Sequence, residues 1–272
     1  MQTDSSLWDA DHPSNLIDAC NSRLEALFCD LQEVAARIAA YLTQVIAKEG
    51  ADVEHLRLSE EARALLQREI IDRLGDARWC DGAGFANYSA PSGAVLPIAT
   101  GGEVAALQDS EYWTLEWWVS EAGDVRQVPL ESDQGRQRRV DFRSFDWFRE
   151  PADRGRAHVA GPYVDYVCNG SYTVTAAHPV FIDGRFAGVG VADILVSTIE
   201  REMSQLLRRL AGPAVIVNPD GRVVVSTEPS VRPGALWPVD DQWQVIVSPN
   251  HPFRLAVSPP KPSSLSRDRD LR

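Results

Sequence analysis

Apolar side chains recur every seven positions between residues 15 and 49, and this repeat restricts the fold more than any other feature of the chain. A second apolar set lies three residues after the first, which places both sets on one face of a helix. A third set widens that face, so we expect a long helix that packs on a surface broader than one partner helix. The three sets are Ile17, Leu24, Leu31, Ile38 and Val45; Cys20, Leu27, Val34 and Tyr41; and Phe28, Ala35 and Leu42.

Proline distribution divides the rest of the chain. Only Pro13 falls in the first 90 residues, whereas ten of the seventeen prolines follow residue 210, so the front can be helical and the back cannot. Ser59 is placed to open a second helix that runs to Leu74. From about residue 81 the apolar residues alternate with a period of two, which is typical of strands.

The expected strands pair mainly as hairpins. Asp183-Gly184 joins two of them, 171–182 and 185–194, by a two-residue turn. We expect a short helix over 142–149 that Pro151 stops, and another that Ser197 and Glu200 open as a capping box and that runs to Leu210. The remaining expected strands are 112–119, 125–130, 163–168, 214–218, 222–227, 243–247 and 253–257.

This order of elements predicts an α+β fold, in which a long N-terminal helix is followed by an antiparallel sheet with flanking helices. We expect four regions along the chain. They are a helical region at 1–80 with its long helix at 15–49, a sheet module at 81–211, a small second β-module at 212–258, and a flexible tail at 259–272.

Charge and hydropathy limit the partners of the chain. With 27 basic and 39 acidic side chains its net charge is −12, which argues against nucleic-acid binding. The N-terminus lacks the pattern of a secretory signal, and the longest apolar-rich stretch, 34–47, contains Arg37 and is too short to span a bilayer. We therefore expect a cytoplasmic protein without membrane insertion.

Motifs of catalysis and of metal binding are absent from the sequence. The five histidines and four cysteines show no metal-ligand spacing, so we expect buried free thiols, no metal site and no cofactor. Asp193 stands where a dinucleotide-binding fingerprint would have its third glycine, and Gly188 and Gly190 are better explained by close approach of another segment or of a ligand. We expect no enzyme, although an enzyme acting on an amine or a related metabolite stays the alternative.

Aromatic side chains and carboxylates interleave between residues 142 and 194. Asp165 shares a strand face with Tyr163, and no basic residue alternates onto that face. Aromatic faces and carboxylates together attract a cation, so such a set suits an ammonium group. The structural alternative is that Trp147 and Phe148 anchor the core and that Asp165 and Asp193 are exposed or bound by backbone amides.

These residues carry a resemblance to a known family. The runs D-F-R-S-F-D-W-F-R-E-P (141–151), G-P-Y-V-D (161–165), Y-T-V-T (172–175), P-V (179–180) and G-V-G-V-A-D-I (188–194) resemble the ligand-binding module of Cache sensor domains, which are PAS-like. The resemblance is strongest over 110–230. It implies a Cache-type module at 81–211 and makes 212–258 compatible with a truncated second module.

The resemblance also implies a site. In double-Cache amino-acid sensors an arginine two residues before the tryptophan holds the ligand carboxylate, whereas the ammonium group is held by aromatic and acidic residues. Phe145 stands at the arginine position here, and a guanidinium is the natural partner of a carboxylate, so the chain resembles the amine-binding subgroup. The implied ligand-binding residues are Trp147, Phe148, Tyr163, Asp165 and Asp193, with Phe145, Trp118 and Tyr172 as further candidates. The sequence leaves open whether Trp117 or Trp118 lines the pocket.

These inferences predict a sensor or binding protein for a small-molecule amine. We expect signal output through a homodimer formed by the helix at 15–49 or through an unknown protein partner. Two alternatives stay open: an amino-acid-binding Cache protein in which Arg143 or Arg149 holds the carboxylate, and a scaffold whose long helix binds another protein.

Overall fold

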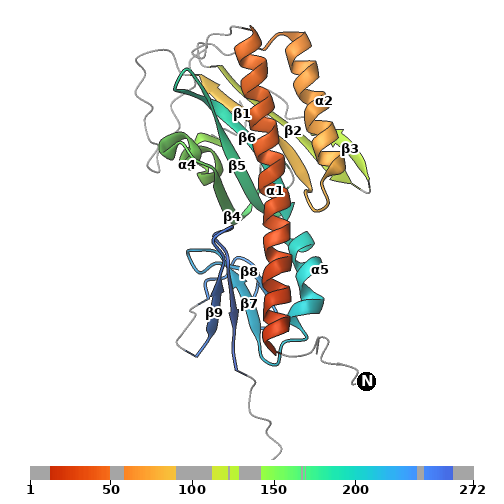
Figure 1. The fold of residues 1–272 in the computed structure, drawn as a ribbon, viewed down its shortest axis with the longest axis vertical. Helices are drawn as coiled ribbons and strands as arrows, with labels where there is room; N and C mark the ends of the chain where they lie inside the picture. Colours follow the sequence, from red (N-terminus) through yellow and green to blue (C-terminus); the bar gives the residue numbers. More distant parts are fainter. Residues whose placement is uncertain are drawn as a thin grey trace, which may run out of the picture. The chain divides into compact units, whose positions relative to one another are not determined.

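The computed structural model describes residues 13–49, 58–89, 112–121, 123–128, 142–166, 168, 170–237 and 242–259. The chain divides into two compact units, one of residues 27–198 and one of residues 1–26 with 199–272. Each unit contains one antiparallel sheet (Figure 1). Residues 260–272 of the expected tail lie outside the described residues.

Two helices precede the first sheet. Helix α1 spans Pro13–Glu49 and α2 spans Glu60–Asp76, as the apolar repeat and the Ser59 signal predict. The Ser59 hydroxyl caps α2 by accepting a hydrogen bond of 3.1 Å from the Ala62 N–H. Along α1 the apolar face is buried, which confirms a helix that packs within the chain on a broad surface.

The first sheet has six antiparallel strands in the order β3-β2-β1-β6-β5-β4. Strands β5 and β6 form the expected hairpin, and Asp183 and Gly184 turn it with positive φ angles of 50° and 77°. The strands are β1 (Gly82–Ser89), β2 (Tyr112–Glu121), β3 (Asp124–Gln127), β4 (His158–Val164), β5 (Tyr172–Ile182) and β6 (Arg185–Leu195).

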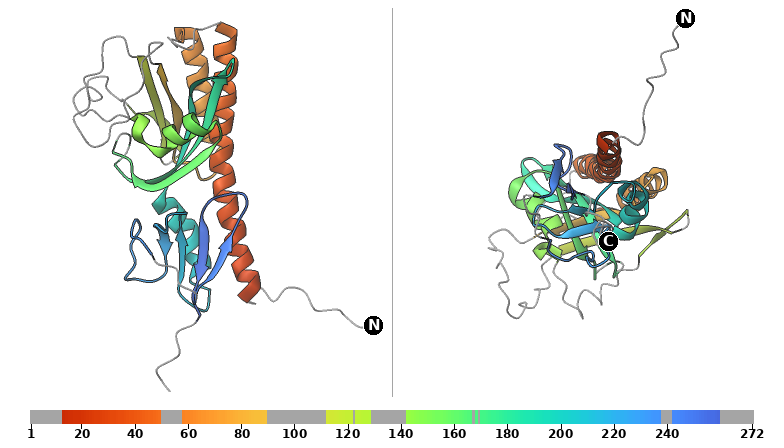
Figure 2. Two further views of the ribbon diagram at one scale, coloured as in Figure 1. Left: turned by 90° about the vertical axis from the view of Figure 1, so that its left-hand side faces the viewer. Right: turned by 90° about the horizontal axis from the view of Figure 1, so that it is seen from below.

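Helices cover both faces of this sheet (Figure 2, left). Residues 27–49 of α1 lie so close to β6 that a Cβ added at Gly190 would stand 2.5 Å from the Ala39 nitrogen. Only glycine allows this approach, which confirms the explanation given for the glycines of this strand. On the opposite face lie the 3-10 helix η2 (Phe142–Ser144) and helix α4 (Asp146–Arg154), which packs on β4, β5 and β6.

Two expected helix ends are wrong. Helix α4 continues through Pro151, whose ring is buried, and ends at Gly155 in the left-handed conformation. Pro151 lies beyond the first turn and lacks an N–H, so one internal hydrogen bond, the one to the Trp147 carbonyl, is lost without ending the helix. The helix expected from Ser197 to Leu210 is α5, which spans Val196–Leu207.

The start of α5 is held by a residue from far away in the sequence. Asp81 accepts hydrogen bonds from the Leu195 N–H (2.8 Å) and from the Thr198 hydroxyl (3.1 Å). Ser197 therefore lies inside the helix and does not cap it. A carboxylate that accepts hydrogen bonds from donors at a helix start has the same physical role as a capping serine.

The second unit contains a four-stranded antiparallel sheet in the order β8-β7-β10-β9. Within this unit Arg23 of α1 pairs with Glu202 of α5 at 2.9 Å. Its strands are β7 (Ala214–Val217), β8 (Val223–Ser226), β9 (Gln244–Val247) and β10 (Arg254–Val257). Among the helices that the structure describes, none is both long and apolar enough to cross a membrane.

All four cysteines are free, as expected. Cys20 and Cys80 are buried and Cys168 is partly buried, but Cys29 is exposed on α1, so the expectation that every thiol is buried is wrong there. In residues 27–49 of α1 the apolar positions of the seven-residue repeat face the six-stranded sheet. Cys29 is not one of these positions and lies on the outer side of the helix.

Candidate ligand-binding site

Side chains from neighbouring strands meet on the face of the six-stranded sheet that α4 covers. Asp193 of β6 lies opposite Thr175 of β5 on one side and opposite Gly82 of β1 on the other. The register of β4 shifts just before Tyr163, which lies opposite Thr173. Since Thr173 and Thr175 are two residues apart on one strand, Tyr163 and Asp193 share this face.

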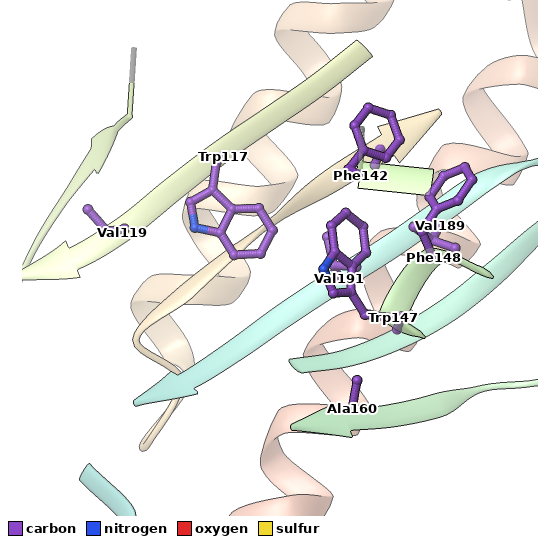
Figure 3. Close-up of a cluster of buried hydrophobic side chains, with 10 residues drawn as sticks. Trp117, Val119, Phe142, Trp147, Phe148, Ala160, Val189 and Val191 are labelled. Atoms are coloured by element: carbon purple, nitrogen blue, oxygen red, sulfur yellow. The ribbon is translucent and has the colours of Figure 1, made fainter. Parts of the chain in front are cut away.

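An aromatic cluster lies over the same face. Helix α4 turns Trp147 and Phe148 toward the sheet, where both are buried with Phe142 from η2 (Figure 3). The ring of Phe145 stacks on Trp147, with centroids 6.2 Å apart, and on Tyr163, with centroids 6.1 Å apart. Trp147 and Phe148 thus pack as core side chains, and Phe145 links them to the tyrosine.

A chain of hydrogen bonds joins the tyrosine to the buried carboxylate. The Thr175 hydroxyl donates to Asp193 Oδ1 at 2.5 Å. Because its one hydrogen is used there, Thr175 accepts from the Tyr163 hydroxyl, 2.6 Å away. Burial, with Asp193 and Asp165 nearby, raises the pKa of Tyr163 well above its ordinary value, so the phenol stays a donor.

Asp193 is a buried acid among negative neighbours. The residue is 2 % exposed. Burial raises the pKa of its carboxyl well above 3.8, and the Asp165 and Asp81 carboxylates raise it further, whereas the Thr175 hydrogen bond lowers it. Among the described residues, the charged groups that act on Asp193 are thus the acids Asp165 and Asp81. A cation placed beside Asp193 would supply the missing countercharge.

Asp165 lies just beyond β4, in a short turn. The residue is 5 % exposed, and its Oδ1 accepts a hydrogen bond of 3.1 Å from the Cys168 N–H. The backbone continues the strand pairing, because the Asp165 N–H donates to the Ser171 carbonyl at 2.9 Å. A backbone amide therefore binds part of the Asp165 carboxylate, as the structural alternative anticipated.

Two of the further candidates lie away from this face. On β2, Trp118 shares its side with Glu116, whose carboxylate pairs with Arg63 of α2, so Trp118 faces the helices and not the site. Tyr172 begins β5 on the side opposite Thr173 and is 42 % exposed. Because side chains alternate between the two faces of a sheet, both residues lie on the face opposite Asp193.

Sequence reasoning missed Thr175 and left open whether Trp117 or Trp118 faces the site. Thr175 lies within the Y-T-V-T run, but its place opposite Asp193 depends on the register of the hairpin. Trp117 of β2 is buried on the site face, next in sequence to Trp118, and packs with the aromatic cluster. Strand alternation shows that one of the two tryptophans must face the site, but only the strand pairing shows which one.

Three other features of the described structure bear on which ligands could bind and where. Arg149, considered for a ligand carboxylate, is exposed on α4 and binds Asp146 at 2.6 Å. No group of three or more His, Cys, Asp or Glu side chains is placed to hold a metal ion within the described ranges. A cavity of about 280 Å³ in the second unit is lined by Leu16, Arg209 and Gln244 among others and includes none of the predicted residues.

Comparisons with known proteins agree with this fold. The sequence model of the family described as "Methyl-accepting chemotaxis protein-like, first PDC sensor domain" matches residues 129–201, the segment that contains Trp147, Phe148, Tyr163, Asp165 and Asp193. No curated protein sequence matches the chain significantly.

Three solved structures show the same likeness. Methyl-accepting chemotaxis protein X is 14 % identical with a TM-score of 0.62, over 92 % of this chain and 96 % of that one. An extracellular ligand binding receptor from Desulfohalobium retbaense is 12 % identical with a TM-score of 0.53, over 90 % of this chain and 39 % of that one. The extracellular domain of mmHK1S-Z3, described as a histidine kinase, is 15 % identical with a TM-score of 0.50, over 80 % of this chain and 70 % of that one.

These comparisons correct one expectation. Two of the three similar structures are extracellular domains, which contradicts the cytoplasmic location inferred from the N-terminus. Neither the missing signal pattern nor the missing apolar span determines where the protein resides. The long N-terminal helix, the antiparallel sheet and its flanking helices together have the fold of PDC/Cache-type sensor domains.

Proposed function

We propose that this chain is a ligand-sensing domain that binds a small amine between Asp193 and Asp165 and the aromatic cluster of α4. The observation that carries the proposal is the buried Asp193 carboxylate, whose charged neighbours within the described part of the chain are other acids. An ammonium group would bind there as countercharge and hydrogen-bond donor. The family match over 129–201 supports a sensing role for the same segment.

The aromatic side chains define the other half of the proposed site. Phe145 stacks between Tyr163 and Trp147, and aromatic rings attract a cation through their quadrupoles. Phe145 stands where the amino-acid sensors have arginine, so the described part of the site offers no guanidinium to a ligand carboxylate at that position. We therefore propose that amines bind in preference to amino acids.

Thermal-shift and calorimetric titrations test the proposal. Ethylamine, putrescine and trimethylamine at millimolar concentration should raise the Tm of the protein, whereas L-alanine and acetate should not. Asp193→Asn should weaken amine binding by about 2 to 5 kcal/mol, the usual cost of removing one partner of a buried charge pair. Asp183→Asn, at the exposed turn of the same hairpin, makes the same charge change and should leave binding intact.

Two outcomes would contradict the proposal. A protein that no amine in the panel stabilises does not bind amines at this site, and an Asp193→Asn variant that binds as the wild type does places the site elsewhere. Stabilisation by L-alanine but not by ethylamine would favour the amino-acid alternative.

We also propose that the signal passes through a homodimer in which α1 contacts α1 of a second copy. Its apolar face is buried within the chain, so this contact would use the outer face, where Cys29 and Ala40 are exposed. Oxidation with copper phenanthroline should then join two copies through Cys29, and Cys29→Ser should abolish the product. A chain that stays monomeric at high concentration would contradict the dimer.

A further inference from the structure

Trp117 brings an unused hydrogen-bond donor to the face that carries Asp193. Its side chain is 3 % exposed, and its indole N–H has no hydrogen-bond partner among the described residues. A buried donor without a partner is costly, so such groups usually face a bound molecule or an ordered water. Figure 3 shows the indole projecting from β2 on the same side of the sheet as Trp147.

Two glycines of β1 leave the space in which this indole lies. A Cβ added at Gly82 would stand 3.0 Å from Trp117 Nε1, and one added at Gly84 would stand 2.9 Å from Trp117 Cε3. The ring therefore lies against the backbone of β1, in space that any other residue would fill. Its nitrogen is the part that lies over Gly82.

The position over Gly82 is next to Asp193. Gly82 and Asp193 are paired residues of neighbouring strands and point to the same face of the sheet. Side chains paired in this way have Cβ atoms about 4.5 to 5.5 Å apart. Because Gly82 has no side chain, the nitrogen edge of Trp117 is the group that adjoins Asp193 on the β1 side.

We propose that Trp117 determines ligand specificity by donating a hydrogen bond to an oxygen that the ligand carries close to its ammonium group. This rests on the proposed amine site at Asp193. The site then holds a donor and an acceptor side by side, which suits amino alcohols and other amines with a hydroxyl, ether or carbonyl oxygen near the nitrogen. A plain alkylamine would leave the indole N–H unpaired or bound to water.

Matched ligand pairs test this inference. Calorimetry compares ethanolamine with ethylamine and 3-aminopropanol with propylamine, each pair differing by one oxygen. Wild-type protein should bind the oxygenated member of at least one pair about tenfold more tightly, a difference of about 1.4 kcal/mol. Trp117→Phe keeps an aromatic ring without the N–H, so it should abolish that preference by lowering the affinity for the oxygenated amine to that for the alkylamine.

The neighbouring tryptophan provides the matched control. Trp118→Phe makes the same change on the helix face of the same strand and should keep the preference. Gly82→Ala, which displaces the indole nitrogen without removing it, should reduce the preference even if Trp117→Phe does not fold. In a ¹⁵N-¹H spectrum the indole signal of Trp117 should move with the oxygenated amine more than with the alkylamine.

The inference and the proposed function fail in different ways. If no amine binds the wild type, the amine site itself is wrong. If amines bind but no pair shows a preference, or Trp117→Phe weakens both members of a pair equally, the amine site stands and the role of Trp117 is overturned. Binding that Trp117→Phe leaves fully selective has the same meaning.

Discussion

Thr175 and Asp193 face each other across the β5–β6 hairpin, and the Thr175 hydroxyl donates a hydrogen bond of 2.5 Å to Asp193 Oδ1. The same hydroxyl accepts from Tyr163, so one threonine joins the aromatic cluster to the buried acid. This contact keeps a charge-bearing group hydrogen-bonded where water is excluded, which lowers the cost of burying it.

Removing the Thr175 hydroxyl should destabilise the protein. In Thr175→Val both Asp193 and Tyr163 lose a buried partner, and we expect the free energy of unfolding to fall by about 1 to 3 kcal/mol. Thr173→Val is the control, since Thr173 lies on the same face but makes only a 3.3 Å contact with the Ser171 carbonyl. Urea denaturation measures the free energy of unfolding of both variants. Equal losses would show that the Thr175 hydrogen bonds contribute no more to stability than the Thr173 contact does.

Stability and amine affinity should change with pH in opposite directions. The pKa of Asp193 is raised on folding, so its contribution to stability is present below pH 3.8 and is lost as the pH rises through the folded-state pKa. A bound ammonium favours the carboxylate, so amine affinity should rise over the same range, with proton release. Calorimetry in buffers of different ionisation enthalpy detects the proton.

Asp193→Asn should remove this linkage. The variant should be more stable than the wild type at neutral pH without ligand, because no buried charge has to form, and its unfolding free energy should depend less on pH. Asp183→Asn should keep the wild-type profile. An unchanged profile in Asp193→Asn would assign the pH dependence to another group.

The close contact of α1 with β6 predicts a large effect of one methyl group. Gly190→Ala would place its Cβ 2.5 Å from the Ala39 nitrogen and 2.7 Å from the Ala35 carbonyl oxygen, so the helix must shift. We expect a loss of about 1 to 3 kcal/mol in thermal or urea unfolding. Gly75→Ala, in open space within α2, should instead stabilise the protein by about 0.5 to 1 kcal/mol. A neutral Gly190→Ala would show that α1 does not pack at this distance.

Thiol labelling should distinguish one cysteine from the other three. Burial raises the pKa of Cys20 to about 11 and, with nearby carboxylates, raises the pKa of Cys80 and Cys168 well above the ordinary value. Cys29 is exposed. A disulfide reagent at pH 8 should therefore modify one thiol rapidly in the native protein, because the thiolate is the reactive form. Cys29→Ser should remove the fast phase; a fast phase that persists would place another thiol in solvent.

Local sequence patterns are enough to predict several elements of the fold. The seven-residue repeat defines α1, because side chains at that spacing share one helix face whatever they pack against. Asp183-Gly184 defines the β5–β6 hairpin, because both residues adopt positive φ in a two-residue turn. Phe145, Trp147, Phe148, Tyr163, Asp165 and Asp193 were chosen from sequence, and the structure brings them to one region of one sheet face.

Tertiary structure decided which residues meet. A hairpin continued from the Ile182–Arg185 pair without interruption would set Asp193 opposite Val174, and the register shift between Val180 and Phe181 sets it opposite Thr175 instead. A bulge adds one residue to one strand and reverses which side chains share a face, and local composition does not reveal it.

Long-range contacts decided the rest. Asp81 takes the place that the sequence assigned to Ser197 at the start of α5, because the pairing of β1 with β6 carries it there from 114 residues away. Trp117 rather than Trp118 faces Asp193 for the same reason: alternation separates the two tryptophans, but only the pairing of β2 with β1 shows which face each one occupies. Patterns along the chain define each element. The site depends on the register between strands, and that register is set by the packing of all the strands together.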